Sequence, residues 1–238
     1  LIVLFCCYHN LIFVALDYAD EVSARQIIDH LSPTLCGVKI GKELFTAAGP
    51  KIVGYAQKKG FEVFLDLKYH DIPNTVKKSC QSAAALGVYM VNVHALGGSE
   101  MMIAAKEGLA LSSHKPLLIA VTLLTSHDQK NLEEMGVQKN MRDEIIHLAN
   151  NVASCGLDGI VCSANDLKFL KSLLPSTFTF VTPGIRLLDS ASDDQKRITT
   201  PEEAVALGST MLVIGRPVTQ SKDPNAALKM IRKKILGD

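Results

Sequence analysis

The sequence predicts an α/β protein folded as a (β/α)8 TIM barrel, on three observations. First, eight short apolar runs rich in β-branched or aromatic residues recur along the chain, as buried strands do. These runs are residues 11–17, 35–41, 61–68, 88–95, 116–125, 159–164, 178–184 and 211–215. Second, helical patterns separate the runs, and glycine ends several of them. Third, eight such units in 238 residues suit one barrel of this kind.

Helices are predicted between the apolar runs. The segments are 21–31, 43–59, 74–87, 101–111, 141–156, 164–174 and 201–208. Pro201 and the two glutamates after it favour a helix start, because proline's missing N–H costs nothing there and acids suit the positive end of the dipole. The basic run 229–234 is predicted to be the solvated face of an amphipathic helix.

A doubly wound open sheet is the main rival fold. Its dinucleotide-binding version would carry a G-x-G-x-x-G motif after the first strand. The sequence there reads LDYADEVS, which lacks those glycines. The barrel is therefore the preferred prediction.

Composition is that of an ordinary soluble globular protein. Hydrophobic residues make up 47% and charged residues 21%, and 25 Lys and Arg against 24 Asp and Glu leave a formal net charge of +1. This balance argues against a nucleic acid or an anionic membrane as a partner held by bulk electrostatics. The six cysteines form no CxxC pair and no zinc-ligand spacing, so we expect them to be reduced, in a cytoplasmic protein.

One catalytic barrel domain is predicted over residues 11–238. Residues 1–10 form an apolar N-terminal extension to which the sequence assigns no role. The apolar stretch at this end is interrupted by polar residues, is short for a transmembrane helix and has no preceding basic residue, so we expect no membrane partner.

Charged residues stand where the predicted strands should be apolar. Asp17 ends the first run, and Lys39 lies inside the second. In the third run Asp66 and Lys68 alternate with leucines, so the period of two puts charged and leucine side chains on opposite faces. Because the leucines must face the helices, Asp66 and Lys68 are predicted to face the barrel interior near its mouth, where barrel enzymes carry their chemistry.

Unpaired charges there would be costly, so these groups should pair with one another. Lys39, Asp66, Lys68 and Asp71 make an alternating set that would keep a lysine protonated and a carboxylate ionised. A purely structural salt-bridge network is the first alternative. A metal site built from Asp66, His70 and Asp71 is the second, although the interleaved lysines would repel a cation.

The last two runs end in TPGIR (182–186) and IGRP (214–217). In many barrels the loops after strands seven and eight bind phosphate through backbone N–H groups. Each segment pairs a glycine, which permits close backbone approach, with an arginine that offers forked donors. These residues are Gly184, Arg186, Gly215 and Arg216. The polar stretch 186–200 is long for such a loop and is typical of a lid.

Segment 66–75 reads DLKYHDIPNT and matches the signature D-x-K-x-x-D-I-P-N-T of the bacterial orotidine 5′-phosphate decarboxylases, which the chain resembles. Sugar-phosphate enzymes of the same superfamily share D-x-K-x-x-D but not usually the I-P-N-T continuation. Further matches follow in the family's order and cover nearly the whole chain from about residue 11. They are LD (16–17), VKIG (38–41), NVHALGG (92–98), LTS (124–126), TPGIR (182–186), Asp194-Gln195 and IGRP (214–217).

The resemblance implies a carboxy-lyase without cofactor or metal that converts orotidine monophosphate to UMP and CO2 in pyrimidine biosynthesis. It also implies a homodimer with active sites shared across the interface. In the catalytic set, Lys68 donates the proton to C6, Asp66 lies beside the departing carboxylate, Lys39 braces Asp66, and Asp71 serves the partner subunit's site.

The resemblance implies the substrate-binding residues as well. They are Asp17 and Lys39 at the ribose, Asp66 at the carboxylate, Ile72 and Thr75 from the partner subunit, Thr125, Ser126 and Pro183 at the pyrimidine, and Arg186, Gln195, Gly215 and Arg216 at the phosphate. His94 either supports these residues or is purely structural.

Two other functions stay open at this point. A metal-dependent sugar-phosphate decarboxylase or aldolase on the same barrel would lose activity with a chelator. A catalytically silent phosphosugar-binding barrel would bind nucleotide without turnover.

Overall fold

Eight parallel strands close into a barrel in the computed structural model, which describes residues 11–186 and 199–236. One strand falls in each predicted apolar run, with β3 extending one residue beyond its run to Tyr69, so the predicted (β/α)8 barrel is confirmed. The strands are β1 (Ile12–Leu16), β2 (Gly37–Gly41), β3 (Val63–Tyr69), β4 (Met90–His94), β5 (Leu117–Val121), β6 (Gly159–Val161), β7 (Thr179–Thr182) and β8 (Met211–Ile214). Strand β8 closes the ring against β1, where Phe13 pairs with Val213.

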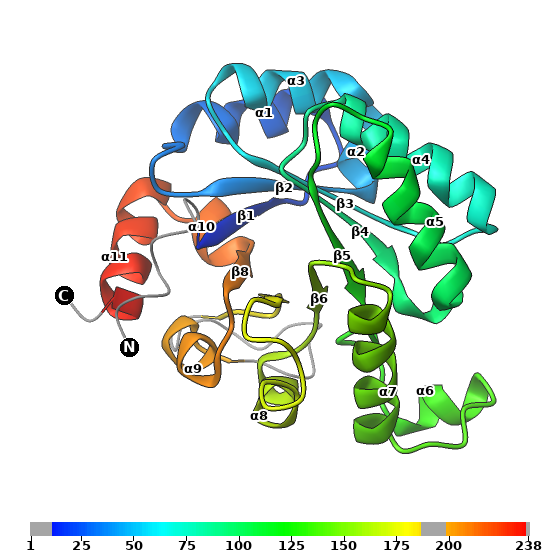
Figure 1. Cartoon of the computed structure of the whole chain (residues 1–238). Helices are drawn as coiled ribbons and strands as arrows, with labels where there is room; N and C mark the ends of the chain where they lie inside the picture. Colours follow the sequence, from blue (N-terminus) through cyan, green and yellow to red (C-terminus); the bar gives the residue numbers. More distant parts are fainter. Residues whose placement is uncertain (1–10, 187–198, 237–238) are drawn as a thin grey trace.

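Helices form an outer layer around the strands (Figure 1). Those in predicted segments are α1 (Glu21–His30), α2 (Lys42–Ala48), α3 (Pro50–Lys58), α4 (Pro73–Ala85), α5 (Gly98–Ala110), α7 (Met141–Ser154), α8 (Leu167–Leu170) and α9 (Pro201–Leu207). The C-terminal basic run lies on α11 (Pro224–Leu236), where Lys229, Lys233 and Lys234 are exposed, as predicted for an amphipathic helix.

Some helix boundaries differ from the prediction. Segment 43–59 is two helices rather than one, because Gly49 adopts a left-handed φ of 65° and Pro50, which has no N–H to extend the first helix, begins the second. Three short elements were not predicted: α6 (Gln129–Glu134), α10 (Arg216–Thr219) and the 3-10 turn η2 (Ala95–Gly97). A second 3-10 turn, η3 (Ala164–Asp166), precedes α8. Such short elements carry too few residues for a helical periodicity to show.

The barrel interior is filled at its amino end by a compact apolar cluster. Its buried members are Phe13, Ala15, Phe64, Met90, Ile119, Val181, Met211 and Val213. The ring of Phe13 meets Phe64 edge-on with centroids 6.2 Å apart and stacks on Tyr89 at 5.7 Å. A Cβ on Gly37 would lie 2.5 Å from the Phe13 ring, so glycine leaves this ring its space. The packed amino end leaves the carboxyl end of the barrel for a cavity.

Strand β3 carries an irregularity that the alternation pattern did not predict. Leu65 pairs with Val91 and Tyr69 with Val93, so four residue steps on β3 oppose two on β4. Bulges of this kind bend a strand and re-aim its side chains, and they are frequent beside active sites. The bulged stretch includes Lys68, the only non-glycine residue with a positive φ in the described part of the chain (51°).

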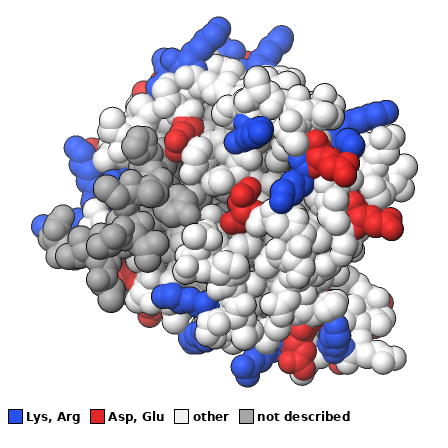
Figure 2. Space-filling view, viewed as in Figure 1, with Lys and Arg blue, Asp and Glu red and all other residues white. Residues whose placement is uncertain are grey.

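Charged side chains of both signs are scattered over the face shown in Figure 2, and neither sign dominates it. Among the helices that the structure describes, none combines the length and the hydrophobicity needed to cross a membrane.

Packing of α4 against α5 gives a stability prediction. Gly108 of α5 is buried, and a Cβ there would overlap the main-chain carbonyl oxygen of Lys77 in α4, which cannot swing aside as a flexible side chain could. Gly108→Ala should therefore lower the free energy of unfolding by about 1–3 kcal/mol, as overpacking does, and urea denaturation measures this difference.

Gly54 supplies the matched control, because it also lies inside a helix, α3, and a Cβ there would meet nothing within 4 Å. Gly54→Ala should raise the free energy of unfolding by about 0.5–1 kcal/mol through helix propensity alone. Equal effects of the two substitutions would contradict the close packing of α4 and α5.

Candidate functional site

A cavity of about 270 Å³ lies at the carboxyl ends of the strands. Its apolar lining consists of Ala15, Val121, Leu123, Leu124, Val161 and Val213. The predicted site residues that line it are Asp17, Lys39, Asp66, Lys68, Thr125, Pro183, Arg186, Gly215 and Arg216, together with Gly184. The structure thus brings residues from seven of the eight strand ends into one pocket.

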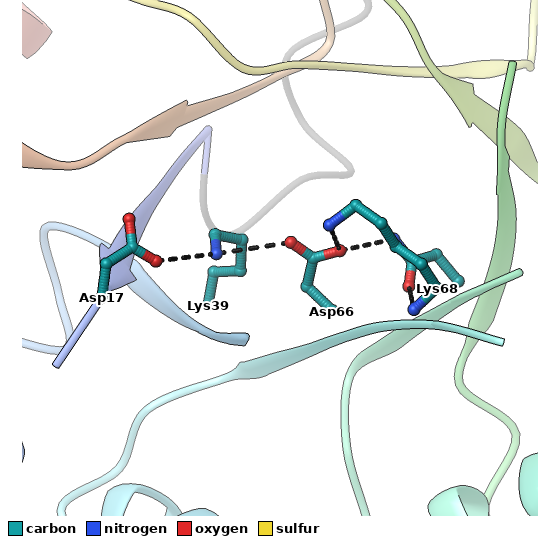
Figure 3. A network of polar contacts seen from close by, with 5 residues as sticks. Asp17, Lys39, Asp66 and Lys68 are labelled. Carbon is teal, nitrogen blue, oxygen red and sulfur yellow. Dashed lines mark hydrogen bonds and ion pairs between the residues drawn. The ribbon is translucent and has the colours of Figure 1, made fainter. Parts of the chain in front are cut away.

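Four of these side chains form a row of alternating charge across the cavity (Figure 3). The ammonium Nζ of Lys39 lies 3.3 Å from Asp17 Oδ1 and 3.3 Å from Asp66 Oδ2. On the other side of Asp66, its Oδ1 accepts a hydrogen bond from Lys68 Nζ at 2.6 Å. Leu65 packs on the helix side of β3, so the predicted division of faces holds at this strand.

Asp66 occupies the centre of the row and is 8% exposed. Burial on its own would raise the pKa of this carboxyl, but the charges of Lys39 and Lys68 and hydrogen bonds from Lys68 and Asn92 outweigh it. The pKa of Asp66 therefore lies below its ordinary value, and the carboxylate stays ionised at neutral pH. Both of its oxygens face lysine ammonium groups, which leaves little room for a cation in the alternative metal site.

The other members of that alternative do not join Asp66. His70 and Asp71 follow β3 and are exposed. Within the residues that the structure describes, no group of three or more His, Cys, Asp and Glu side chains is arranged to hold a metal ion.

Asn92 of β4 is a contact of this row that sequence reasoning did not assign. The side chain is fully buried, its Nδ2 donates to Asp66 Oδ1 at 2.7 Å, and its Oδ1 accepts from the backbone N–H of Lys68 at 2.8 Å. A signal was present, because the alternation of β4 turns Met90 inward and Val91 and Val93 outward, which places Asn92 on the inner face.

The cavity also holds the two glycine–arginine pairs. Gly184 and Arg186 follow β7, while Gly215 and Arg216 follow β8. A Cβ on Gly215 would contact Ala15 and Asp17, so this loop passes directly beside the end of β1. The predicted phosphate-binding groups are thus in the same pocket as the charged row. Gln195 and most of the predicted lid, residues 187–198, lie outside the described residues, as does the N-terminal extension 1–10.

Four predicted site residues do not line the cavity of their own chain. Asp71, Ile72 and Thr75 stand at the start of α4 and are exposed, with 67% of Ile72 accessible. The carboxylate of Asp71 accepts a hydrogen bond from the N–H of Ile72 at 2.7 Å. Ser126, beside Thr125 after β5, is exposed as well. The predicted alternating set was Lys39, Asp66, Lys68 and Asp71. In the structure the second carboxylate of the row is that of Asp17 rather than that of Asp71.

His94 lies at the end of β4 and does not line the cavity. Its ring lies 5.6 Å from that of His70, and its buried Nδ1 has no hydrogen-bond partner among the described residues. Burial is the main cause that lowers the pKa of His94 to about 4. Electrostatic interactions with His70, Lys42 and Lys68 act in the same direction, and the charge of Asp66 acts against them. The imidazole is therefore neutral at physiological pH.

This lowered pKa predicts a pH-dependent stability. Between about pH 6.5 and pH 4 the unfolded chain protonates this histidine and the folded chain does not, so the folded state loses stability as the pH falls through that window. His94→Gln should flatten the decline of the melting temperature between these pH values. The exposed His147 of α7 is the control, and His147→Gln should leave the wild-type slope intact. Equal slopes for all three proteins would contradict a buried, neutral His94.

Comparison with known proteins places this site in a family. The model of the orotidine 5′-phosphate decarboxylase / HUMPS family matches residues 10–231. The orotidine 5′-phosphate decarboxylase of Chromobacterium violaceum is 52% identical over 224 residues, which are 94% of this chain and 91% of that protein. The orotidine 5′-phosphate decarboxylase of Nitrosospira multiformis is 51% identical over 224 residues, which are 94% of this chain and 93% of that protein. The crystal structure of orotidine 5′-phosphate decarboxylase from Lactobacillus acidophilus superposes with a TM-score of 0.85 at 38% identity, covering 96% of this chain and 99% of that one. The chain therefore belongs to the orotidine 5′-phosphate decarboxylase family.

Proposed function

We propose that this cavity decarboxylates orotidine 5′-monophosphate to UMP and CO2, with Lys68 as the proton donor to C6 of the pyrimidine. The observation that carries the proposal is the row Asp17–Lys39–Asp66–Lys68, which ends in an ammonium group inside a pocket that also holds Arg186 and Arg216. Family membership and the relatives at about half identity support the activity itself.

The chemistry requires a positive group where charge develops. Loss of CO2 from C6 leaves a carbanion with poor delocalisation, so the site must stabilise negative charge as it forms. The ammonium of Lys68, held by Asp66, can do this electrostatically and then deliver its proton to C6. Asp66 lies beside the departing carboxylate in this arrangement, and their repulsion would favour departure.

The substrate would lie across the pocket with its phosphate at the glycine–arginine end. Arg186, Gly215 and Arg216, with Gln195 from the loop between β7 and α9, would hold the phosphate through forked and backbone donors. Asp17 and Lys39 would bind the ribose hydroxyls, and Thr125, Ser126 and Pro183 would contact the pyrimidine. Because the phosphate is remote from C6, its binding energy would serve to position the base at Lys68.

The reaction is proposed to need neither metal nor cofactor. Every step assigned above is carried by side chains, with Lys68 as acid and Lys39 as the brace of Asp66. Both carboxylate oxygens of Asp66 already form ion pairs with these two lysines.

A homodimer is proposed as the working form. Asp71, Ile72 and Thr75 belong to the family signature yet do not line the cavity of their own chain, and an isoleucine that is 67% exposed suits a contact with a second subunit. In a twofold dimer, each active site would then take Lys68 from one chain and Asp71 from the other.

A cytoplasmic location is proposed for this biosynthetic enzyme. Cys36, Cys80, Cys155 and Cys162 are free thiols, which suits a reducing compartment. Burial raises the pKa of Cys36 and of Cys80 to about 12, so these two thiols behave as small apolar groups.

Substituting Lys68 tests the proton donor. Lys68→Ala should lower turnover of orotidine monophosphate by at least about 10²–10⁴, because loss of the general acid alone has that magnitude, while UMP still binds through the phosphate and ribose contacts. Absorbance loss of the substrate measures turnover, and calorimetry measures UMP binding. A variant with more than about a tenth of wild-type turnover would overturn the assignment.

Two controls accompany this assay. Lys51→Ala removes an exposed lysine of α3 and should leave turnover unchanged. Wild-type turnover should be equal with and without EDTA. Inhibition by EDTA would point to the metal-dependent enzymes of the superfamily, and UMP binding without any turnover would point to a silent phosphosugar-binding barrel.

Mixed dimers test the shared site. Lys68→Ala and Asp71→Asn homodimers should both be nearly inactive. In a heterodimer of the two variants one site carries both changes and the other carries neither, so random co-expression should restore about a quarter of wild-type activity. Heterodimers that form but stay inactive would show that Asp71 acts within its own chain.

A further inference from the structure

Asn92 closes a hydrogen-bonded ring through both members of the proposed catalytic pair. Its Nδ2 donates to Asp66 Oδ1, which also accepts from Lys68 Nζ, and its Oδ1 accepts from the backbone N–H of Lys68. From this ring we infer that Asn92 is a positioning residue of the decarboxylation, which holds Lys68 and Asp66 in the geometry needed for proton transfer. This inference rests on the proposed function.

The amide of Asn92 is oriented by chemistry on both sides. A carboxylate can only accept a hydrogen bond and a backbone N–H can only donate one, so Nδ2 must face Asp66 and Oδ1 must face Lys68. No ionised acid, basic or aliphatic side chain of similar size offers a donor and an acceptor at these two points. The residue is fully buried, so water does not compete for either contact.

The backbone of Lys68 needs this support. The bulge between Leu65 and Tyr69 interrupts the regular β3–β4 ladder, and within it Lys68 adopts a φ of 51°, where a side chain with a Cβ is strained. The side-chain oxygen of Asn92 satisfies the N–H of Lys68 at this point. Without that contact, the N–H of Lys68 would lose its partner on β4, and the strained backbone that aims the ammonium group would lose this support.

The position of Asp66 depends on the same amide. Its Oδ1 is shared by Lys68 Nζ at 2.6 Å and Asn92 Nδ2 at 2.7 Å, while its Oδ2 faces Lys39. The amide therefore keeps the carboxylate from rotating as Lys68 gives up its proton. A loss of this contact should appear in the chemical step rather than in the binding of a ligand held at the far end of the pocket.

Asn92→Ala tests the inference through a split between kcat and binding. We expect kcat for orotidine monophosphate to fall about 10- to 100-fold, because misplacement of a reacting group by about 1 Å costs on that order, while the Kd of UMP changes less than about threefold. Ser209→Ala is the control for the loss of a buried polar side chain outside the charged row. Ser209 is buried, and its hydroxyl donates a hydrogen bond to Thr182 Oγ1. This substitution should lower the melting temperature without changing kcat.

Asn92→Asp keeps the shape of the side chain, and the pH dependence of its kcat gives a second, independent readout. In this variant a carboxylate oxygen replaces Nδ2 and faces Asp66. The two carboxyl groups would share a proton at low pH, and they would repel each other once that proton is lost at higher pH. Relative to wild type, kcat of Asn92→Asp should fall as the pH rises, whereas the deficit of Asn92→Ala should not change with pH. A purely structural asparagine would not produce this difference.

An active wild type with an equally active Asn92→Ala would overturn the inference and leave the proposed function standing. Parallel pH profiles for Asn92→Asp and wild type would overturn it as well. A wild type that does not decarboxylate orotidine monophosphate would overturn the proposed function, and the inference with it.

Discussion

The buried carboxylate of Asp66 is the constraint on which the site depends. An ionised group that is 8% exposed must be compensated, and removal of one partner from a buried ion pair costs about 3–5 kcal/mol. Lys39 compensates one oxygen, and Lys68 and Asn92 compensate the other. The reactive ammonium is therefore placed by the need to neutralise Asp66, so that the stability of this region and the chemistry share one set of contacts.

The barrel supplies this set of contacts because its parallel strands all end at one face. Asp17, Lys39 and Asp66 come from three consecutive strands or strand ends, and neighbouring strands bring them into a row without any long connection. The amino end is filled by aromatic rings around Phe13, so the polar groups are confined to the carboxyl end. There the loops after β7 and β8 also line the cavity, and Gly215 lies beside Asp17.

Much of this architecture follows from local patterns in the sequence. Apolar runs locate all eight strands, and the period of two places Asp66 and the side chain of Lys68 at the barrel mouth. The bulge in β3 could not be predicted, because it depends on how β4 pairs with β3 rather than on composition. The contacts of Asn92 are hidden for the same reason: the alternation of β4 puts this asparagine on the inner face, but the groups that it bonds depend on how β4 pairs with β3. The break at Gly49-Pro50, in contrast, was readable from the two residues themselves.

The four charges of the row balance one another. Two carboxylates, of Asp17 and Asp66, alternate with two ammonium groups, of Lys39 and Lys68, so the row is neutral when it is empty. A substrate carboxylate at Asp66 would add one uncompensated negative charge at the most buried point. Its departure as CO2 leaves that charge on C6, next to Lys68. Proton transfer neutralises C6 and leaves Lys68 as an uncharged amine, so the row becomes neutral again when Lys68 takes up a proton from solvent. The resting site is therefore matched in charge to the product rather than to the substrate, and the phosphate contacts supply the binding energy that brings the mismatched substrate into place.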